Sequence, residues 1–156
     1  MIKILPIIIA PNPILRKKSI EIDFKKISID KIKKLCSAMY ATIIKADGVG
    51  LAAPQIGKNI QLIVLHTQNG QLNFLNPKII KKSWTKILDN EGCLSVPEIY
   101  SQVKRYKNIT CQYFDETGKK LILNAEGLLA RVIQHEIDHL NGILFIDKAI
   151  KAKNYG

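Results

Sequence analysis

Apolar residues recur at helical spacing in an early segment of the chain. From Ile29 to about Lys45 they fall three and four positions apart, which is typical of an amphipathic helix. Ser28 or Asp30 can cap its start, and Gly48 lies just beyond its end. The apolar stripe consists of Ile29, Ile32, Leu35, Cys36, Met39 and Ile43.

A second helix is predicted from about Glu126 to Leu140, with Asn141-Gly142 as its stop. At 100° per residue, the apolar Leu128 and Val132 lie within about 60° of His135 and His139. The clearly polar residues fill only one narrow arc: Arg131, Gln134, Asp138 and Asn141. A helix that is apolar over most of its circumference is buried. We therefore expect the two histidines to face the interior or a cleft.

Short apolar runs in the middle of the chain predict strands. They cover residues 60–66, 72–75, 103–107, 109–114 and 120–123. Asp115-Glu116-Thr117-Gly118 reads as the turn of a hairpin. Met1–Pro11 is a short apolar run interrupted by Pro6 and has no small-residue cleavage site, so it predicts a strand or extended arm. Without repeats or linkers, residues 1–156 are expected to form a single domain.

The composition is that of a folded, soluble protein. Of 156 residues, 47% are hydrophobic and 24% charged, which excludes disorder, and no run approaches the roughly 18 apolar residues of a membrane span. The net charge of +11 invites a nucleic-acid interpretation. However, the basic residues are scattered as pairs, with no aromatic residues interleaved in a stacking pattern. We expect a solvated surface and no specific nucleic-acid partner.

Three cysteines cannot pair completely, and none stands in a close Cys-x-x-Cys spacing. This favours a reducing compartment, the cytoplasm, over a secreted disulfide scaffold. Cys36 lies on a helical apolar stripe and Cys111 in a predicted strand, so both are interpreted as structural. Cys93 is left as a candidate nucleophile or metal ligand.

The string His135-Glu136-Ile137-Asp138-His139 carries the first chemical signal. Histidines at i and i+4 on one helical face can hold one metal ion, with the glutamate in reach of an activated water. A catalytic site needs a third protein ligand. Phe145 stands where some metalloproteases have a downstream histidine, and no glutamate follows Glu136. The third ligand must lie upstream, with His66, Cys93 and several carboxylates as candidates.

Cys93 lies in Glu91-Gly92-Cys93-Leu94-Ser95-Val96-Pro97, 42 residues before His135. A thiolate beside two imidazoles gives a Cys-His-His set with an open fourth position, suited to Zn²⁺, Fe²⁺, Co²⁺ or Ni²⁺. The alternative is a cysteine nucleophile activated by His135 or His139. That alternative leaves Glu136 and one histidine without a role.

Glycines and alanines crowd the segment from Gly48 to Gly57. Such residues let a backbone approach a ligand closely, and Gln55 offers an amide there. No lysine followed by Ser or Thr stands at P-loop spacing, so this is not a phosphate-binding loop.

Together these segments resemble the peptide deformylase family. G-V-G-L-A-A-P-Q, E-G-C-L-S and Q-H-E-I-D-H match its three motifs in the family's order, and the likeness extends from about Leu5 to Asp147. The resemblance implies an α+β fold with antiparallel sheets wrapped around a central buried helix that carries H-E-x-x-H. It also implies a metal-dependent hydrolase of protein biosynthesis that removes the formyl group from N-terminal formyl-methionine of newly made polypeptides, releasing formate.

The resemblance also implies a role for individual residues. The metal, with Fe²⁺ favoured, is expected on Cys93, His135 and His139, and Glu136 is expected to be the general acid/base. The remaining assignments are Gln55 and the Leu94 N–H for the developing oxyanion, Gly50 for the peptide backbone, and Val49, Leu128 and Val132 for the methionine pocket.

Two departures from the family pattern limit what is transferred. Tyr100 stands where many bacterial members carry an arginine near the substrate cleft, so it receives no binding role. The last matched segment ends about ten residues before Gly156. We therefore expect the C-terminal helix by which some members dock on the ribosome to be missing or very short. A monomer with at most transient ribosome proximity is expected.

Two other functions remain alternatives. The same H-E-x-x-H suggests an ordinary zinc endopeptidase, although the missing downstream ligand and Cys93 count against it. The basic charge suggests an RNA- or ribosome-binding module with a structural metal.

Overall fold

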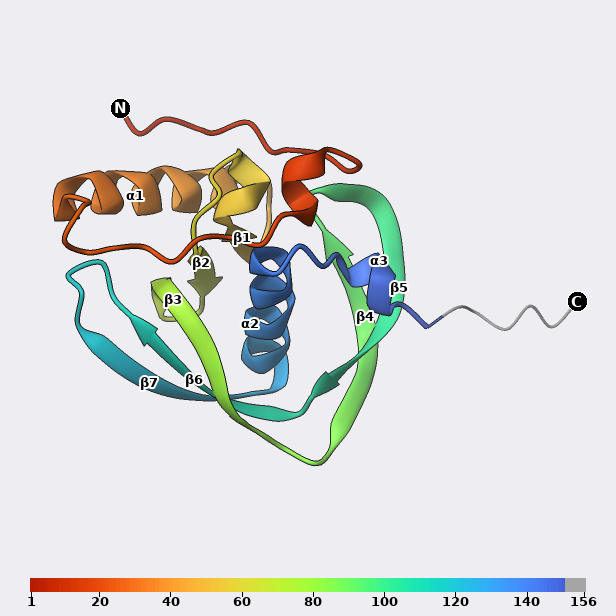
Figure 1. Ribbon diagram of the computed structural model, residues 1–156. Helices are drawn as coiled ribbons and strands as arrows, with labels where there is room; N and C mark the ends of the chain where they lie inside the picture. The colour runs from red at the N-terminus through yellow and green to blue at the C-terminus, as the bar shows by residue number, and fades with distance from the viewer. Residues whose placement is uncertain (151–156) are drawn as a thin grey trace, which may run out of the picture.

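The computed structural model describes residues 1–150, which fold as α+β with antiparallel sheets (Figure 1). The helical elements are η1 (Pro13–Arg16), α1 (Ile29–Lys45), η2 (Ala53–Ile56), α2 (Gly127–Leu140) and α3 (Phe145–Lys148). The strands are β1 (Gly50–Ala52), β2 (Leu62–Thr67), β3 (Gly70–Lys82), β4 (Lys86–Cys93), β5 (Val96–Tyr106), β6 (Asn108–Phe114) and β7 (Lys120–Glu126).

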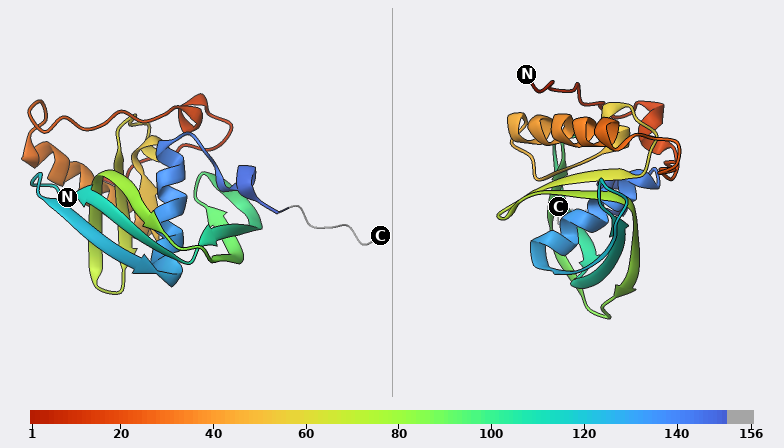
Figure 2. Two further views of the ribbon diagram at one scale, coloured as in Figure 1. Left: turned by 60° about the horizontal axis from the view of Figure 1, so that its bottom comes forward. Right: turned by 90° about the vertical axis from the view of Figure 1, so that its left-hand side faces the viewer.

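Two antiparallel sheets surround α2. The larger one has the strand order β1-β2-β3-β6-β7, and β4 pairs with β5 in a separate hairpin. In Figure 1 α2 stands at the centre, with the larger sheet curving around one side and the β4–β5 hairpin on the other. The turned views in Figure 2 show α1 packed as a separate layer above the sheet. The expectation of antiparallel sheets around a buried helix is confirmed.

The predicted helices form for the reasons that the sequence suggested. The Ser28 hydroxyl accepts a hydrogen bond from the Lys31 N–H and caps α1, whose apolar stripe packs against β1 and β2. Helix α2 ends at Asn141, followed by Gly142 at a φ of +73°. Its apolar faces pack inside the larger sheet, beside buried residues such as Phe74 and Cys111.

The strands are longer and more numerous than predicted. The run expected at 72–75 belongs to β3, which continues to Lys82, and 103–107 falls mostly within β5. Strands β1 and β4 were not predicted at all. The 115–118 turn is confirmed by the backbone bond from the Asp115 N–H to the Lys119 carbonyl.

The N-terminal segment is an extended arm and contains no named strand before η1. The Ile8 N–H donates to the Gln55 carbonyl at 2.7 Å, and the Ala10 N–H donates to the Ser95 carbonyl at 2.9 Å. The arm thereby ties together two segments that are 40 positions apart in the sequence.

Within residues 1–150, no helix has the length and apolar character needed to cross a membrane. The expectation of a missing or very short C-terminal helix concerns residues 151–156, which lie outside the described part of the chain.

Candidate metal centre and substrate pocket

Helix α2 and strand β4 bring three metal-ligating side chains together. His135 and His139 lie one turn apart on α2, with exposed fractions of 8% and 1%, and Cys93 is the last residue of β4. The Cys93 Sγ lies 3.3 Å from the His139 Nε2. Ligand atoms of all three residues lie within 4.8 Å of one another. Of the upstream candidates, Cys93 is therefore the one that joins the two histidines.

This arrangement fits a tetrahedral metal ion. Bond lengths of about 2.3 Å to sulfur and 2.0–2.1 Å to nitrogen place ligand atoms about 3.3–3.6 Å apart. Burial holds the pKa of His139 well below its usual range, so this imidazole stays neutral with a lone pair to offer. One thiol and two imidazoles match the ligand preferences of zinc and of the neighbouring transition metals.

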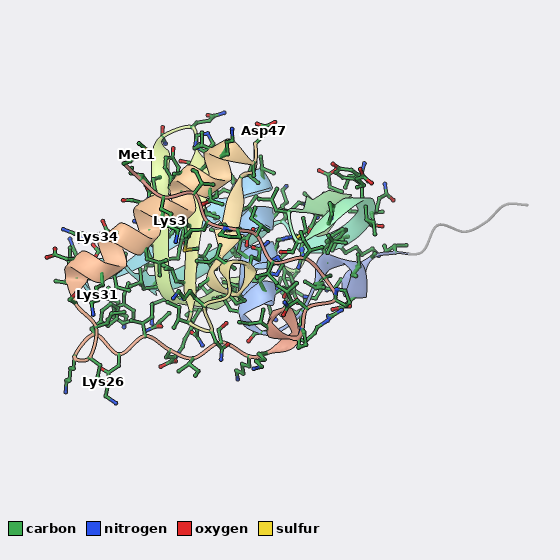
Figure 3. The ribbon with its side chains drawn as sticks, turned by 90° about the horizontal axis from the view of Figure 1, so that it is seen from above. Met1, Lys3, Lys26, Lys31, Lys34 and Asp47 are labelled. Carbon is green, nitrogen blue, oxygen red and sulfur yellow. The ribbon has the colours of Figure 1, made fainter. Side chains whose placement is uncertain are left out.

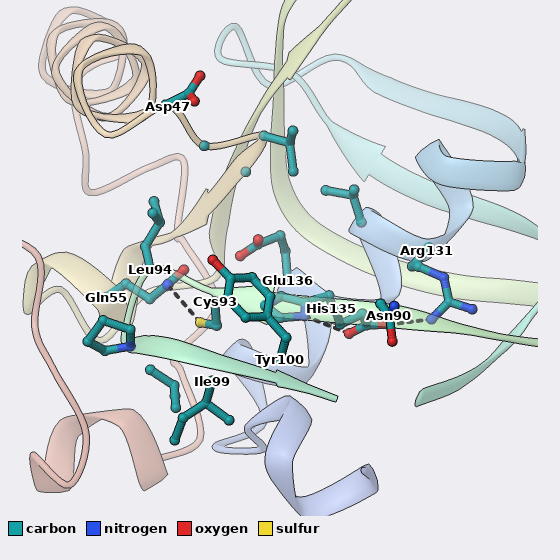
Figure 4. A pocket seen from close by; sticks show the side chains of 18 of the residues that line it. Asp47, Gln55, Asn90, Cys93, Leu94, Ile99, Tyr100, Arg131, His135 and Glu136 are labelled. Atoms are coloured by element: carbon teal, nitrogen blue, oxygen red, sulfur yellow. Dashed lines mark hydrogen bonds and ion pairs between the residues drawn. The ribbon is translucent and has the colours of Figure 1, made fainter. Parts of the chain in front are cut away.

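Glu136 lies beside these ligands and lines the pocket (Figure 4). Burial raises its pKa to about 7, which suits a group that takes up and returns a proton near neutral pH. Its Oε2 has no hydrogen-bond partner among the described residues. A Cβ at position 50 would lie 2.8 Å from the Glu136 Oε1, so any larger residue there would displace the Glu136 side chain.

The Gln55 side chain is held in a fixed orientation at the other end of the site. Its Oε1 accepts a hydrogen bond from the Ala52 N–H at 2.9 Å, and its Nε2 donates to the Ser95 hydroxyl at 3.1 Å. The same Nε2 lies 3.6 Å from the Cys93 Sγ. Because the oxygen is engaged by the backbone, the amide N–H₂ points toward the thiol. Leu94 lines the pocket directly after Cys93.

A buried network of charges lies behind the candidate metal ligands. The Glu91 Oε1 accepts from the His135 Nδ1 at 2.9 Å, and the carboxylate also accepts from Arg105 and Arg131. Arg105 continues to Asp138 on α2. Burial works to raise the pKa of Glu91, but Arg105 and His135 outweigh it and hold that pKa well below its usual range. Glu91 thus remains an anion that orients the His135 ring.

Sequence reasoning missed this network. Glu91 was seen only as part of a motif, and Arg131 only as part of the polar arc of α2. Arg131 also donates to the Val103 and Ile87 carbonyls, at 2.9 Å and 2.7 Å, and so fastens the β4–β5 hairpin to α2. The signal available in the sequence was a run of ionisable residues on a helix otherwise expected to be buried.

The pocket has a volume of about 420 Å³ and opens beside Glu136. Val49, Gly50, Leu128 and Val132, assigned to substrate binding by resemblance, all line it. Leu128 is 69% exposed and therefore forms part of the mouth. The Tyr100 ring crosses the cavity in front of Cys93 in Figure 4. It lies so close to Gly92 that a Cβ there would meet it at 2.7 Å.

The other histidine and cysteines lie outside the site. The His66 Nδ1 is hydrogen-bonded to the Tyr40 hydroxyl, and Cys36 and Cys111 are buried in the two parts of the core. The interpretation of the two cysteines as structural agrees with these positions, and His66, a candidate for the third ligand, lies away from the two histidines of α2.

Comparison with known proteins agrees with the geometry of this site. The model of the polypeptide deformylase family matches residues 4–155. The chain belongs to this family. It is accordingly a hydrolase, and the metal-ligand cluster of Cys93, His135 and His139 agrees with the family's dependence on a metal ion. A peptide deformylase of Rhizobium meliloti is 46% identical over 154 residues, which cover 95% of this chain and 86% of the relative.

Solved deformylase structures share the whole fold. That of Thermotoga maritima superimposes with a TM-score of 0.90 at 36% identity, covering 95% of this chain and 99% of the other. A class I type b enzyme from Acinetobacter baumannii, bound to Met-Ala-Ser, gives a TM-score of 0.89 at 31% identity, with coverages of 95% and 99%.

In this deformylase chain we predict that one thiol of three reacts in the native, metal-free protein. Burial raises the pKa of Cys36 to about 12 and that of Cys111 to about 11, whereas Cys93 lines the open pocket. Iodoacetamide labelling followed by mass spectrometry should show one adduct per native chain and three after denaturation. Zn²⁺ added beforehand should protect Cys93. Rapid native labelling of Cys36 or Cys111 would contradict their burial.

Proposed function

We propose that this chain removes the formyl group from the N-terminal formyl-methionine of newly made polypeptides and releases formate. The observation that carries the proposal is the Cys93, His135 and His139 cluster beside the buried Glu136, at the end of a pocket with apolar walls. The relative bound to Met-Ala-Ser supports a peptide that begins with methionine as the product.

Cys93, His135 and His139 would hold one divalent metal ion. Such an ion supplies Lewis-acid polarisation of a carbonyl oxygen and lowers the pKa of water toward 7. His135 is oriented for this task by Glu91, and Cys93 is placed by the end of β4.

The proton transfers fall to Glu136. Its carboxylate accepts a proton from the attacking water. It then donates this proton to the methionine nitrogen, as the bond between that nitrogen and the formyl carbon breaks and formate is released. Because this side chain is 4% exposed and lines the same cavity, bulk water does not compete for that proton. A pKa of about 7 makes both the uptake and the return of the proton inexpensive.

The negative charge that develops on the formyl oxygen would be stabilised by the Gln55 amide and the Leu94 N–H. The hydrogen bond from the Ala52 N–H to the Gln55 Oε1 holds the amide in its donating orientation before substrate arrives. Gly50 would pair with the substrate backbone, since β1 is the edge strand of the larger sheet and an extended peptide can add to such an edge.

The direct test compares two peptides with the purified enzyme. Formyl-Met-Ala-Ser should yield one formate per peptide, with Met-Ala-Ser as the only other product. Cleavage inside an unformylated peptide, without formate release from the formylated one, would instead identify an endopeptidase.

We further propose that the native metal is Fe²⁺, because of the family resemblance, while the ligand types also suit Zn²⁺, Co²⁺ and Ni²⁺. Protein prepared without oxygen should contain iron by elemental analysis. Loaded with Fe²⁺, it should be more active than the Zn²⁺ form, and air should oxidise the iron together with Cys93. Equal activities, with iron absent from the anaerobic preparation, would count against Fe²⁺.

The pocket is expected to select methionine. Val49, Leu128 and Val132 form apolar walls, and a flexible thioether adapts to irregular apolar surfaces. A Val132→Asp variant should lose kcat/KM for formyl-Met peptides while its metal content stays near stoichiometric. A Val132→Thr variant, nearly equal in shape, is the control and should lose less. Similar kcat/KM values for formyl-Met and formyl-Asp peptides with the wild type would refute the pocket assignment.

The cellular setting is proposed on the same basis. A deformylase of new polypeptides works where they are made, so we propose a cytoplasmic monomer with transient ribosome proximity.

A further inference from the structure

The only tryptophan of the chain is fully exposed. Trp84 has an exposed fraction of 103% and lies in the turn between β3 and β4, formed by Ser83, Trp84 and Thr85 and called here the Trp84 tip. A tryptophan buries more apolar surface than any other side chain when it packs in a core. Here it belongs to none of the three hydrophobic core clusters, so its position is not explained by folding.

The backbone of the Trp84 tip is hydrogen-bonded to the turn between β5 and β6. The Ser83 N–H donates to the Asn108 carbonyl at 2.9 Å, and the Asn108 N–H donates back to the Ser83 hydroxyl at 3.1 Å. The Lys107 N–H donates to the Thr85 carbonyl at 3.0 Å. The backbone beneath Trp84 is therefore fixed, and the indole is presented to solvent at little entropic cost on binding.

Exposed lysines lie near Trp84 along the chain, namely Lys81, Lys82 and Lys86, and Lys107 is bonded through its backbone to Thr85 of the tip. Two of them flank a second aromatic ring, since the Nζ atoms of Lys82 and Lys86 lie 4.9 Å and 4.7 Å from the Tyr106 centroid. The sequence-based expectation that no aromatic residue is interleaved with the basic ones was wrong at this place.

A shallow cleft of about 510 Å³, lined mostly by polar residues, adjoins the Trp84 tip at Ser83. Lys81 and Lys82 stand on one side of it, and Asn108, Thr110 and Asn124 add hydrogen-bonding side chains. Its one acidic lining residue is Glu126. A polar cleft with lysines and an adjacent exposed ring suits a sugar-phosphate strand with a free base better than it suits lipid chains.

We propose that the Trp84 tip and its lysines bind single-stranded RNA without sequence preference, with a base stacked on Trp84 and phosphates on the lysines. Stacking on an aromatic face tolerates every base, and lysines contact phosphates as point charges. Lys86 is seven residues before Cys93 on β4, which corresponds to about 23 Å along an extended strand. RNA bound at the tip leaves the substrate pocket open.

The experiment uses the intrinsic fluorescence of the metal-loaded full-length chain. Since Trp84 is the sole tryptophan, quenching on addition of oligouridylate reports contact at the tip itself. We expect quenching with a Kd of about 10⁻⁶–10⁻⁴ M that weakens steeply as salt is raised. Unchanged fluorescence at saturating RNA would overturn the proposal.

Variants distinguish the tip from general charge. By anisotropy of labelled oligouridylate, Trp84→Ala should weaken binding about 5- to 150-fold, and Trp84→Phe should restore part of the loss. Lys82→Gln with Lys86→Gln should reduce the slope of log K against log salt by about 1.4. Lys31→Gln with Lys34→Gln removes equal charge from α1, where Figure 3 labels both side chains. Helix α1 lies at the opposite end of the molecule from the β3–β4 turn in Figure 1.

The α1 double variant should bind almost as the wild type does, and an equal loss in both double variants would overturn the proposal. The third measurement replaces RNA with vesicles of phosphatidylglycerol. A blue shift of Trp84 fluorescence with vesicles, and no quenching with RNA, would identify a membrane surface instead. Formate release from short formyl peptides should be unchanged in every one of these variants, which would show that each is folded.

Discussion

A Glu136→Gln variant is expected to keep its metal and to release formate about a hundredfold to ten-thousandfold more slowly than the wild type. The amide has nearly the same shape as the carboxylate, so the ligands Cys93, His135 and His139 keep their places. It cannot accept a proton from water, however, and the buried position of Glu136 leaves no substitute base. Formate release should be measured at matched metal content, determined by elemental analysis.

A Glu126→Gln variant is the matched control, because it makes the same change at an exposed residue just before α2. Its turnover should equal that of the wild type. Undiminished turnover in Glu136→Gln would remove this residue from the mechanism, whereas loss of metal from that variant would make it a structural support for the ligands.

An Arg105→Met variant is expected to lose about 1.5–3 kcal/mol of unfolding free energy, since Glu91 and Asp138 lose the buried cation that bridges them and keep only Arg131 and Lys148 as charged partners. Arg105 is 3% exposed and lies between Glu91 and Asp138. Methionine preserves most of the side-chain length, so lost packing contributes little. The free energy should be measured by urea denaturation of the metal-free protein, which separates this effect from metal binding.

Arg16→Met provides the comparison at the surface. Arg16 also pairs with an aspartate, Asp147, but the two side chains are 48% and 38% exposed. An exposed pair contributes about 0–1 kcal/mol, because water already solvates both charges. Equal destabilisation by the two substitutions would show that the Glu91 network does not behave as a buried one.

The helices were predictable because their stability depends on a local pattern. The apolar stripe of α1 and the nearly all-round apolar character of α2 repeat every three to four residues, whatever packs against them. Strand β4 has no such pattern: all but Glu91 among its residues from Lys86 to Gly92 are exposed, so no period of two appears. Beyond Leu75, Pro77 and the lysines at 81 and 82 concealed the second half of β3.

The residues of the site also divide into those that a local sequence pattern predicts and those that only the tertiary structure brings together. His135 and His139 could be paired from sequence, because four residues make about one helical turn, whereas the choice of Cys93 among the upstream candidates rested on the family resemblance. Arg105 and Arg131 could not be connected to Glu91, since their proximity depends on how the β4–β5 hairpin folds back on α2. Ser95 and its bond to Gln55 likewise exist only in the tertiary structure.

The placement of the metal ligands sets the order in which a newly made chain can mature. Cys93 ends β4, but its partners lie on α2, and the intervening residues are strands β5, β6 and β7. During synthesis, Cys93 is therefore incorporated into the chain well before His135 and His139. Metal affinity comes from the assembled set of ligands, so it is gained in one late step when α2 docks. A chain that has been synthesised only as far as β7 contains Cys93 without either histidine partner, so uptake of an ion by the proposed site would mark completion of the fold.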